Sequence, residues 1–192
     1  LLLEDVSIKI NFSNNNITKL NKPKYNWKIN IIETGYSTMT GGRLLRAEKF
    51  LKDKRFFLTY GDCLSDVNLK KLEELHTKEK SIVTLSGVQQ KSRYGSIKIK
   101  KNENKIFQFS EKVIQKDNYI NGGFFICNKE VFEYLDNDKT VFEEGPLERL
   151  AKENKLSCYK HNGFWHPMDN LKDKNSLEEI YNSKKAPWIK YK

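Results

Sequence analysis

Residues 56–67, with the sequence FFLTYGDCLSDV, decide the fold that this chain is expected to adopt. The stretch opens with a largely apolar run that is typical of a buried strand, and the run ends at Asp62. Ser65 and Asp66 follow as candidate capping residues, and a helical pattern begins at Leu69. In open α/β sheets ligands bind beyond the carboxyl ends of strands, so Asp62 can hold a metal against a phosphate. Asp62 can equally be a turn residue or a helix cap, and this stretch alone leaves both interpretations open.

The composition is that of a folded globular protein. The chain has 192 residues, of which 38% are hydrophobic and 12% aromatic, so it can bury a substantial core. No apolar stretch is long enough to span a bilayer, and no signal peptide is visible. The sequence begins with Leu1 and not with Met, and we therefore expect the N-terminus to be a cut from a longer chain.

Cysteine and charge usage exclude several classes of site. Cys63, Cys127 and Cys158 are far apart, odd in number and form no C-x-x-C pair, which argues against a zinc site or a disulfide framework and favours the reducing cytoplasm. Asp62 should raise the pKa of the neighbouring Cys63 thiol, which opposes a nucleophilic role. The net charge is +10, but the basic residues are scattered. This pattern favours small anionic substrates such as phosphates over a nucleic-acid partner.

The rest of the chain alternates predicted strands and helices. Strands are expected at 6–12, 27–32, 56–60, 81–85, 124–127 and 156–161, with a hairpin formed by 97–99 and 106–109 and turns at 13–16 and 92–95. Helices are expected at 44–51, 69–75, 129–135, from Pro146 onward, and at 176–183. This order predicts an α/β fold with a mixed central sheet in a single domain, residues 1–192.

Three features could meet at one site. Residues 34–43 form a loop rich in hydroxyl groups and glycines before a helix, where free N–H groups attract anions and Arg43 could bind a phosphate in a forked contact. An ordinary capped helix is the alternative interpretation of this loop. Asp62 is the second feature, and Asp169, flanked by Trp165 and Met168, is the third. Two carboxylates on separate loops can share one Mg²⁺ ion, although spacing alone does not show that they converge.

The order of these motifs resembles the glucose-1-phosphate cytidylyltransferases, within the sugar-phosphate nucleotidyltransferase family. The resemblance covers essentially the whole chain. The matching stretches are 37–44 (STMTGGRL), 58–62 (LTYGD), 93–95 (RYG), 111–112 (EK), 120–125 (INGGFF), 163–169 (GFWHPMD), 172–175 (KDKN) and 185–188 (KAPW).

The resemblance implies a Rossmann-like nucleotidyltransferase fold and a reaction in which glucose 1-phosphate attacks the α-phosphorus of CTP, giving CDP-glucose and pyrophosphate. It implies that Asp62 and Asp169 bind Mg²⁺ and that Lys112 neutralises phosphate charge as the third catalytic residue. It also implies a cytoplasmic enzyme of O-antigen-type polysaccharide biosynthesis, a homo-oligomer at full length, with no nucleic-acid or membrane partner. The residues it implies in substrate or nucleotide binding are Thr38, Arg43, Gly61, Arg93, Asn121, Gly122, Gly123 and Trp165.

The chain also departs from the family pattern. The glycine-rich G-x-G-T-R-L loop of the family, which holds the triphosphate, is absent, so we expect an N-terminally truncated form of the fold. Cys63 stands where the family usually has Gly, Val113 replaces Pro, and His166 replaces Gln. We therefore expect the 192-residue chain alone to be weak or inactive in nucleotidyl transfer. The alternatives are a catalytically impaired fragment that binds sugar phosphate or nucleotide, and a basic RNA-binding domain, which would need clustered lysines and stacking aromatics.

Overall fold

The computed structural model describes residues 8–19, 28–90, 96–100, 104–111 and 118–189. They belong to two units, Leu1–Glu33 and Thr34–Lys192. The first unit contains an antiparallel hairpin of β1 (Ile8–Asn11) and β2 (Asn16–Lys19), so the expected first strand and turn are confirmed and β2 was missed. The strand expected at 27–32 is wrong over residues 28–32, where Ile31 is 96% exposed. Alternating polarity does not supply the hydrogen-bonding partner that a strand requires.

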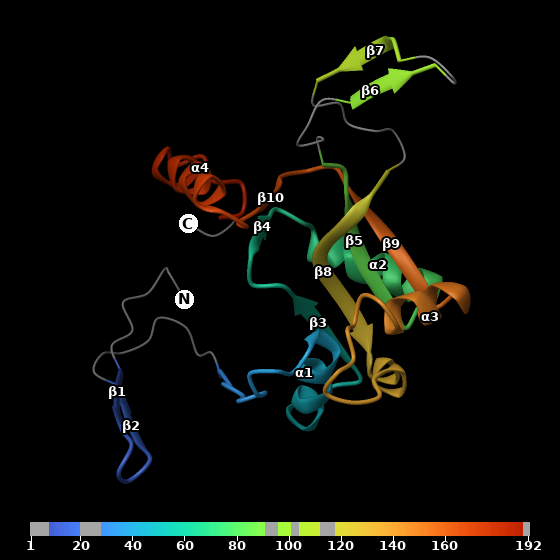
Figure 1. Ribbon diagram of the computed structural model, residues 1–192. Helices are drawn as coiled ribbons and strands as arrows, with labels where there is room; N and C mark the ends of the chain where they lie inside the picture. Colours follow the sequence, from blue (N-terminus) through green and yellow to red (C-terminus); the bar gives the residue numbers. More distant parts are fainter. Residues whose placement is uncertain (1–7, 20–27, 91–95, 101–103, 112–117, 190–192) are drawn as a thin grey trace. The chain divides into compact units, whose positions relative to one another are not determined.

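A four-stranded mixed sheet forms the centre of the second unit, which confirms the predicted α/β class (Figure 1). The strand order is β3 (Arg55–Thr59), β8 (Ile120–Asn128), β5 (Val83–Val88) and β9 (Leu156–His161). β8 is antiparallel to both β3 and β5, whereas β5 and β9 are parallel. The run around Phe57 was expected to be buried, but β3 is an edge strand of this sheet and the Phe57 side chain is 49% exposed.

Helices cover both faces of this sheet. On one face α2 (Leu69–Glu79) places His76 against Thr84 of β5, with 2.9 Å between Nδ1 and Oγ1. On the other face Val83 of β5 and Phe125 of β8 belong to the main core. The elements that complete that core are α1 (Thr40–Ala47), η2 (Lys129–Tyr134), the segment around Phe142 and α3 (Pro146–Lys152). A short 3₁₀ helix, η1 (Glu48–Phe50), follows α1.

Two short ribbons and a last helix complete the unit. β4 (Cys63–Ser65) pairs with β10 (Trp165–Pro167), and β6 (Ser96–Ile99) pairs with β7 (Ile106–Ser110), as expected for the hairpin. α4 (Leu171–Asn182) begins five residues before its predicted start. Among the described residues, no helix is long and apolar enough to cross a bilayer.

Strand directions position the site. Because β8 runs opposite to its neighbours, its first residues lie at the same edge as the last residues of β3, β5 and β9. The register shows this directly, since Thr59 pairs with Phe124, Val88 with Ile120, and Val88 also with His161. The segments that follow β3, β5 and β9 therefore meet the start of β8 at one edge of the sheet, where ligands bind in open α/β sheets.

Candidate functional site

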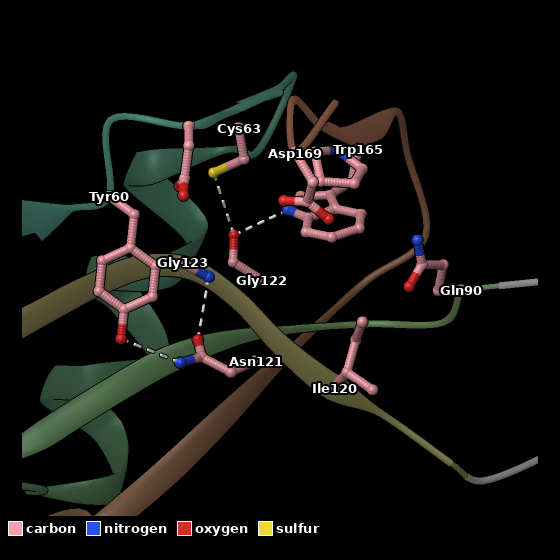
Figure 2. A pocket seen from close by; sticks show the side chains of 11 residues that line it. Tyr60, Cys63, Gln90, Ile120, Asn121, Gly122, Gly123, Trp165 and Asp169 are labelled. Carbon is pink, nitrogen blue, oxygen red and sulfur yellow. Dashed lines mark hydrogen bonds between the residues drawn. The ribbon is translucent and has the colours of Figure 1, made fainter. Parts of the chain in front are cut away.

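A pocket of about 290 Å³ opens at this edge (Figure 2). It brings together six of the predicted site residues, namely Asp62, Asn121, Gly122, Gly123, Trp165 and Asp169. The other lining residues are Tyr60, Cys63, Gln90, Ile120 and Pro167. A second hollow of about 560 Å³ shares Gln90, Trp165 and Pro167 with this pocket and extends toward Asn162 and Asp173.

The β4–β10 ribbon brings the two predicted metal carboxylates to the same pocket. Cys63 pairs with Pro167, and one step further the Met168 N–H donates to the Asp62 carbonyl oxygen at 2.8 Å. Asp62 thus precedes β4 and Asp169 follows β10 at the same end of the ribbon. These two residues are 107 positions apart in sequence, and only the pairing of two three-residue strands places them together.

The start of α4 holds Asp169 in place. The Asn170 side chain caps the helix by accepting a hydrogen bond from the Asp173 N–H at 3.0 Å. The Asp173 carboxylate in turn accepts from the Asn170 amide at 2.8 Å and from the Asp169 N–H at 3.3 Å. This reciprocal capping satisfies N–H groups that a helix start leaves without partners. It anchors the backbone of Asp169 to a rigid element.

The two glycines of the pocket belong to β8. The sequence predicted a strand that begins only at residue 124, with both glycines before it. A Cβ atom on Gly122 would lie 2.7 Å from Ser86 Oγ, so glycine allows β8 to approach β5 closely. Gly123 has a φ of +76°, a conformation that glycine adopts at little cost. The Gly122 carbonyl accepts a hydrogen bond from Trp165 Nε1 at 2.8 Å, which fixes the indole in the pocket wall.

The Cys63 thiol faces the same carbonyl, with 3.7 Å between Sγ and the Gly122 oxygen. Burial raises the pKa of Cys63 above its ordinary value, and the charge of Asp62 raises it further. The direction of the pKa shift expected from the sequence is therefore confirmed. Because the thiolate is the reactive form, Cys63 is poorly suited to act as a nucleophile or a metal ligand.

A buried histidine ties the ribbon to β9. His161 Nε2 lies 3.1 Å from Asp66 Oδ1, 3.2 Å from Ser65 Oγ and 3.1 Å from the Phe164 carbonyl oxygen. In a catalytic Ser-His-Asp triad the acid and the serine contact different ring nitrogens, so this cluster is a structural link. A Cβ on Gly163 would lie 2.4 Å from Asp66 Oδ1, and glycine is needed there for the contact to form.

The predicted capping role of Ser65 and Asp66 is wrong, because both belong to this link. The N-cap of α2 is Asn68, whose side chain accepts from the Lys71 N–H at 3.0 Å. The sequence pattern correctly predicted a capped helix at Leu69 but not which polar residue caps it. Several polar residues precede the helix, and tertiary contacts decide among them.

At the loop before α1, the N–H groups of Met39, Gly41 and Gly42, which were expected to be free for an anion, have acceptors within the chain. Gly41 and Gly42 lie inside the helix, and both N–H groups donate to the Thr140 carbonyl oxygen, at 3.0 and 3.3 Å. The Met39 N–H donates to the Asp138 carbonyl oxygen at 2.8 Å. A Cβ on Gly42 would lie 2.6 Å from the Asp138 backbone, so this glycine serves helix–loop packing and not close approach of a phosphate.

Thr38 and Arg43 lie outside the pocket lining. Thr38 is buried, and the Arg43 guanidinium donates to Thr34 Oγ1 at 2.7 Å and to the Tyr36 carbonyl oxygen at 3.4 Å. Gly61 also is not a lining residue, but a Cβ atom there would meet nothing within 4 Å. Their substrate-binding roles stay predictions. Lys112 and Arg93 lie outside the residues that the structure describes.

Comparison with known proteins identifies the family. The model of the nucleotidyl transferase family matches residues 6–173. A probable glucose-1-phosphate cytidylyltransferase of Bacillus subtilis (strain 168) is 37% identical over 183 residues, which cover 95% of this chain and 70% of that protein. The chain belongs to the nucleotidyl transferase family.

Two further comparisons agree with this assignment. The glucose-1-phosphate cytidylyltransferase of Salmonella typhimurium (strain LT2) is 40% identical over 163 residues, which cover 84% of this chain and 63% of that protein. The crystal structure of HddC from Yersinia pseudotuberculosis superimposes with a TM-score of 0.60 at 26% identity, covering 82% of this chain and 68% of that one. The resemblance to the cytidylyltransferases is confirmed, and the chain spans about two thirds of the length of these relatives.

The nucleotidyl transferase pattern did not single out every residue of the pocket. Tyr60 lies inside the matching stretch 58–62, but its apolar neighbours predict only the end of a strand, and Gln90 and Ile120 carry no chemical signal of their own. The positions of Tyr60 and Gln90 just after β3 and β5 could have indicated them, because the carboxyl edge of such a sheet collects whatever follows each strand. Ile120 reaches the same edge as the first residue of the antiparallel β8. That inference needs the strand order, which the sequence alone does not provide.

Proposed function

We propose that the protein to which this chain belongs transfers a cytidylyl group from CTP to glucose 1-phosphate, giving CDP-glucose and pyrophosphate. The observation that carries the proposal is the placement of Asp62 and Asp169 in one pocket at the carboxyl edge of the sheet. The names and identities of the relatives from Bacillus subtilis and Salmonella typhimurium support the choice of reaction. We further propose a cytoplasmic, oligomeric enzyme that supplies nucleotide sugar for polysaccharide synthesis.

The donor set of the pocket fits Mg²⁺. Asp62 and Asp169 offer carboxylate oxygens, which this ion prefers, whereas Cys63 keeps its proton and offers no thiolate. Within the described part of the chain, no group of three or more His, Cys, Asp or Glu side chains could hold a metal. A metal held by Asp62 and Asp169 would therefore need phosphates and water as further ligands, which is how Mg²⁺ is commonly bound. When bound, Mg²⁺ would supply Lewis acidity toward the α-phosphate.

The residues of the chain would contribute mainly positioning, which is what phosphoryl-type transfer requires of a protein. Trp165 is held by its hydrogen bond to the Gly122 carbonyl and forms a fixed wall beside Asp169 (Figure 2). The Asn121 side chain lines the same pocket, where its amide would bind an oxygen of a sugar phosphate. Asp62 and Asp169 would hold the Mg²⁺ ion, whose charge would favour binding of the negatively charged substrates.

The test is pyrophosphate release by the 192-residue chain and by a longer chain that includes the glycine-rich loop of the family. Each is incubated with CTP, glucose 1-phosphate and Mg²⁺, and with other nucleoside triphosphates as competitors. Asp62→Asn and Asp169→Asn in the longer chain should each reduce kcat at least a hundredfold, because each removes a carboxylate from the metal site. Asp53→Asn is the matched control, since Asp53 is an exposed carboxylate that precedes β3 and lies at the other end of that strand.

Equal activity of the Asp62→Asn and wild-type proteins would refute the assigned role of the pocket. Transfer from another nucleotide in preference to CTP would refute the choice of base. Binding of glucose 1-phosphate without transfer by the longer chain would support the alternative of a catalytically impaired binding protein. We expect the 192-residue chain to show little or no transfer.

A further inference from the structure

The Tyr60 hydroxyl connects the pocket to a carboxylate that does not line it. The hydroxyl donates a hydrogen bond to Glu143 Oε1. It also accepts one from Asn121 Nδ2, with 3.3 Å between nitrogen and oxygen (Figure 2). The other carboxylate oxygen of Glu143, Oε2, accepts from Thr40 Oγ1 at 2.7 Å. A continuous chain of hydrogen bonds thus runs from the start of α1 through Glu143 and Tyr60 to the pocket.

The position of the tyrosine proton follows from this arrangement. The ordinary pKa of a tyrosine hydroxyl is about 10, so the Tyr60 phenol carries its proton at neutral pH. A hydroxyl has one proton to donate, and the carboxylate can only accept, so this proton is committed to Glu143. Only lone pairs of the Tyr60 oxygen remain for Asn121.

Both ends of the Asn121 amide are assigned as a result. Nδ2 must face Tyr60, and Oδ1 accepts from the Gly123 N–H at 2.9 Å. In the flipped orientation the amide oxygen would face an oxygen that has no proton to give, and the NH₂ group would face an N–H. The assigned orientation leaves the amide a second N–H and a second lone pair for a ligand. Because Asn121 lines the pocket, its amide offers a ligand oxygen a donor of fixed direction.

We propose that Glu143 is a positioning residue which, through Tyr60, fixes the orientation of the Asn121 amide so that the pocket presents an N–H donor to an oxygen of the sugar phosphate. The choice of ligand rests on the function proposed above. Glu143 itself is half-buried and is not among the described residues that line the pocket. A purely structural role, joining the segment around Phe142 to the end of β3, is the competing explanation.

Four single variants separate these explanations. Tyr60→Phe keeps the ring and its edge contact with Phe125, at 5.4 Å between centroids, but removes the hydroxyl. Glu143→Ala frees the tyrosine proton, whereas Glu143→Gln retains a carbonyl oxygen that can accept it. Tyr134→Phe is the matched control, because it removes a similar tyrosine–carboxylate bond, with 2.6 Å between the Tyr134 hydroxyl and Glu153 Oε2, at a site away from the pocket.

The first readout does not depend on activity or on any ligand. The side-chain ¹⁵N–¹H resonances of Asn121 are recorded in the 192-residue chain. Tyr60→Phe and Glu143→Ala should shift these resonances and speed their exchange with solvent, Glu143→Gln should restore the wild-type pattern, and Tyr134→Phe should leave it unchanged. Unchanged Asn121 resonances in Glu143→Ala would overturn the proposal.

The second readout is binding of glucose 1-phosphate by calorimetry. Tyr60→Phe and Glu143→Ala should weaken binding about fivefold, the effect of one neutral hydrogen bond. In an Asn121→Ala background Tyr60→Phe should cause no further loss, because Tyr60 acts through Asn121. A further fivefold loss in that background would overturn the proposal. If the wild-type chain binds no sugar phosphate, the choice of ligand fails, while the Asn121 resonances still decide whether Glu143 positions the amide.

Discussion

Gly122→Ala should destabilise the fold by about 1–3 kcal/mol, the usual cost of forcing an extra carbon into a packed interior. The added Cβ would lie 2.7 Å from Ser86 Oγ, 2.9 Å from Val88 Cγ1 and 3.0 Å from the Ser86 carbonyl oxygen. Ser86 cannot give way easily, because it is buried and its hydroxyl accepts from the Phe124 N–H at 3.3 Å. The crowding atoms include backbone, so β8 must move away from β5.

The assay is urea unfolding followed by circular dichroism and by tryptophan fluorescence. The fluorescence of the folded variant should also change, because the Gly122 carbonyl that accepts from Trp165 moves with β8. Gly145→Ala is the control, since a Cβ there meets nothing within 4 Å and its φ is −93°. That substitution should be neutral or stabilising by up to about 1 kcal/mol. A Gly122→Ala variant within about 0.5 kcal/mol of wild type, with unchanged fluorescence, would refute the packing argument.

Two further predictions concern pH and ligand approach. Burial lowers the pKa of His76 below its ordinary value of 6.5, so below pH 6.5 the unfolded chain binds a proton that the folded chain resists. The stability that neutral His76 contributes is therefore present above pH 6.5 and is lost as the pH falls. In urea unfolding at pH 5 to 8, His76→Gln should reduce the slope of the unfolding free energy against pH. Identical slopes for the variant and the wild type would contradict this prediction. Gly61→Ala should leave the unfolding free energy within about 0.5 kcal/mol of wild type, because the space around its Cβ is open. It should nevertheless weaken sugar-phosphate binding in calorimetry if a phosphate approaches that backbone, and unchanged binding would remove Gly61 from the site.

Local patterns of the sequence predicted most of the second unit. The apolar run before Asp62 is β3, the helix after it begins at Leu69, and the strand at 156–161 has the predicted limits. These predictions succeeded because hydrophobic periodicity and capping act over a few residues. The predictions failed where a strand forms only by pairing with a distant segment. Residues 28–32 have strand-like alternation but form no strand, and β10 is too short to show a pattern of its own.

Gly41 and Gly42 show, at single positions, the same difference between what local sequence predicts and what tertiary contacts decide. Gly41 and Gly42 suggested a phosphate loop, but they are glycines because the segment around Thr140 packs against the start of α1. The sequence showed only that glycine, the residue without a side chain, stands at both positions. It could not indicate whether a ligand or another part of the chain occupies the space, since close approach of either one excludes a Cβ atom.

For the candidate site too, the sequence predicted the residues and the tertiary structure decided their arrangement. The sequence by itself determined which side chains are candidates for the site, since Asp62, Asn121, Trp165 and Asp169 were all predicted from motifs read in order. Tertiary structure alone decided that they meet, because the antiparallel course of β8 and the β4–β10 ribbon bring distant segments to one edge. It alone also joined Glu143 to Tyr60, 83 positions away, since a hydrogen bond between side chains depends on their positions in space and leaves no periodic trace in the sequence.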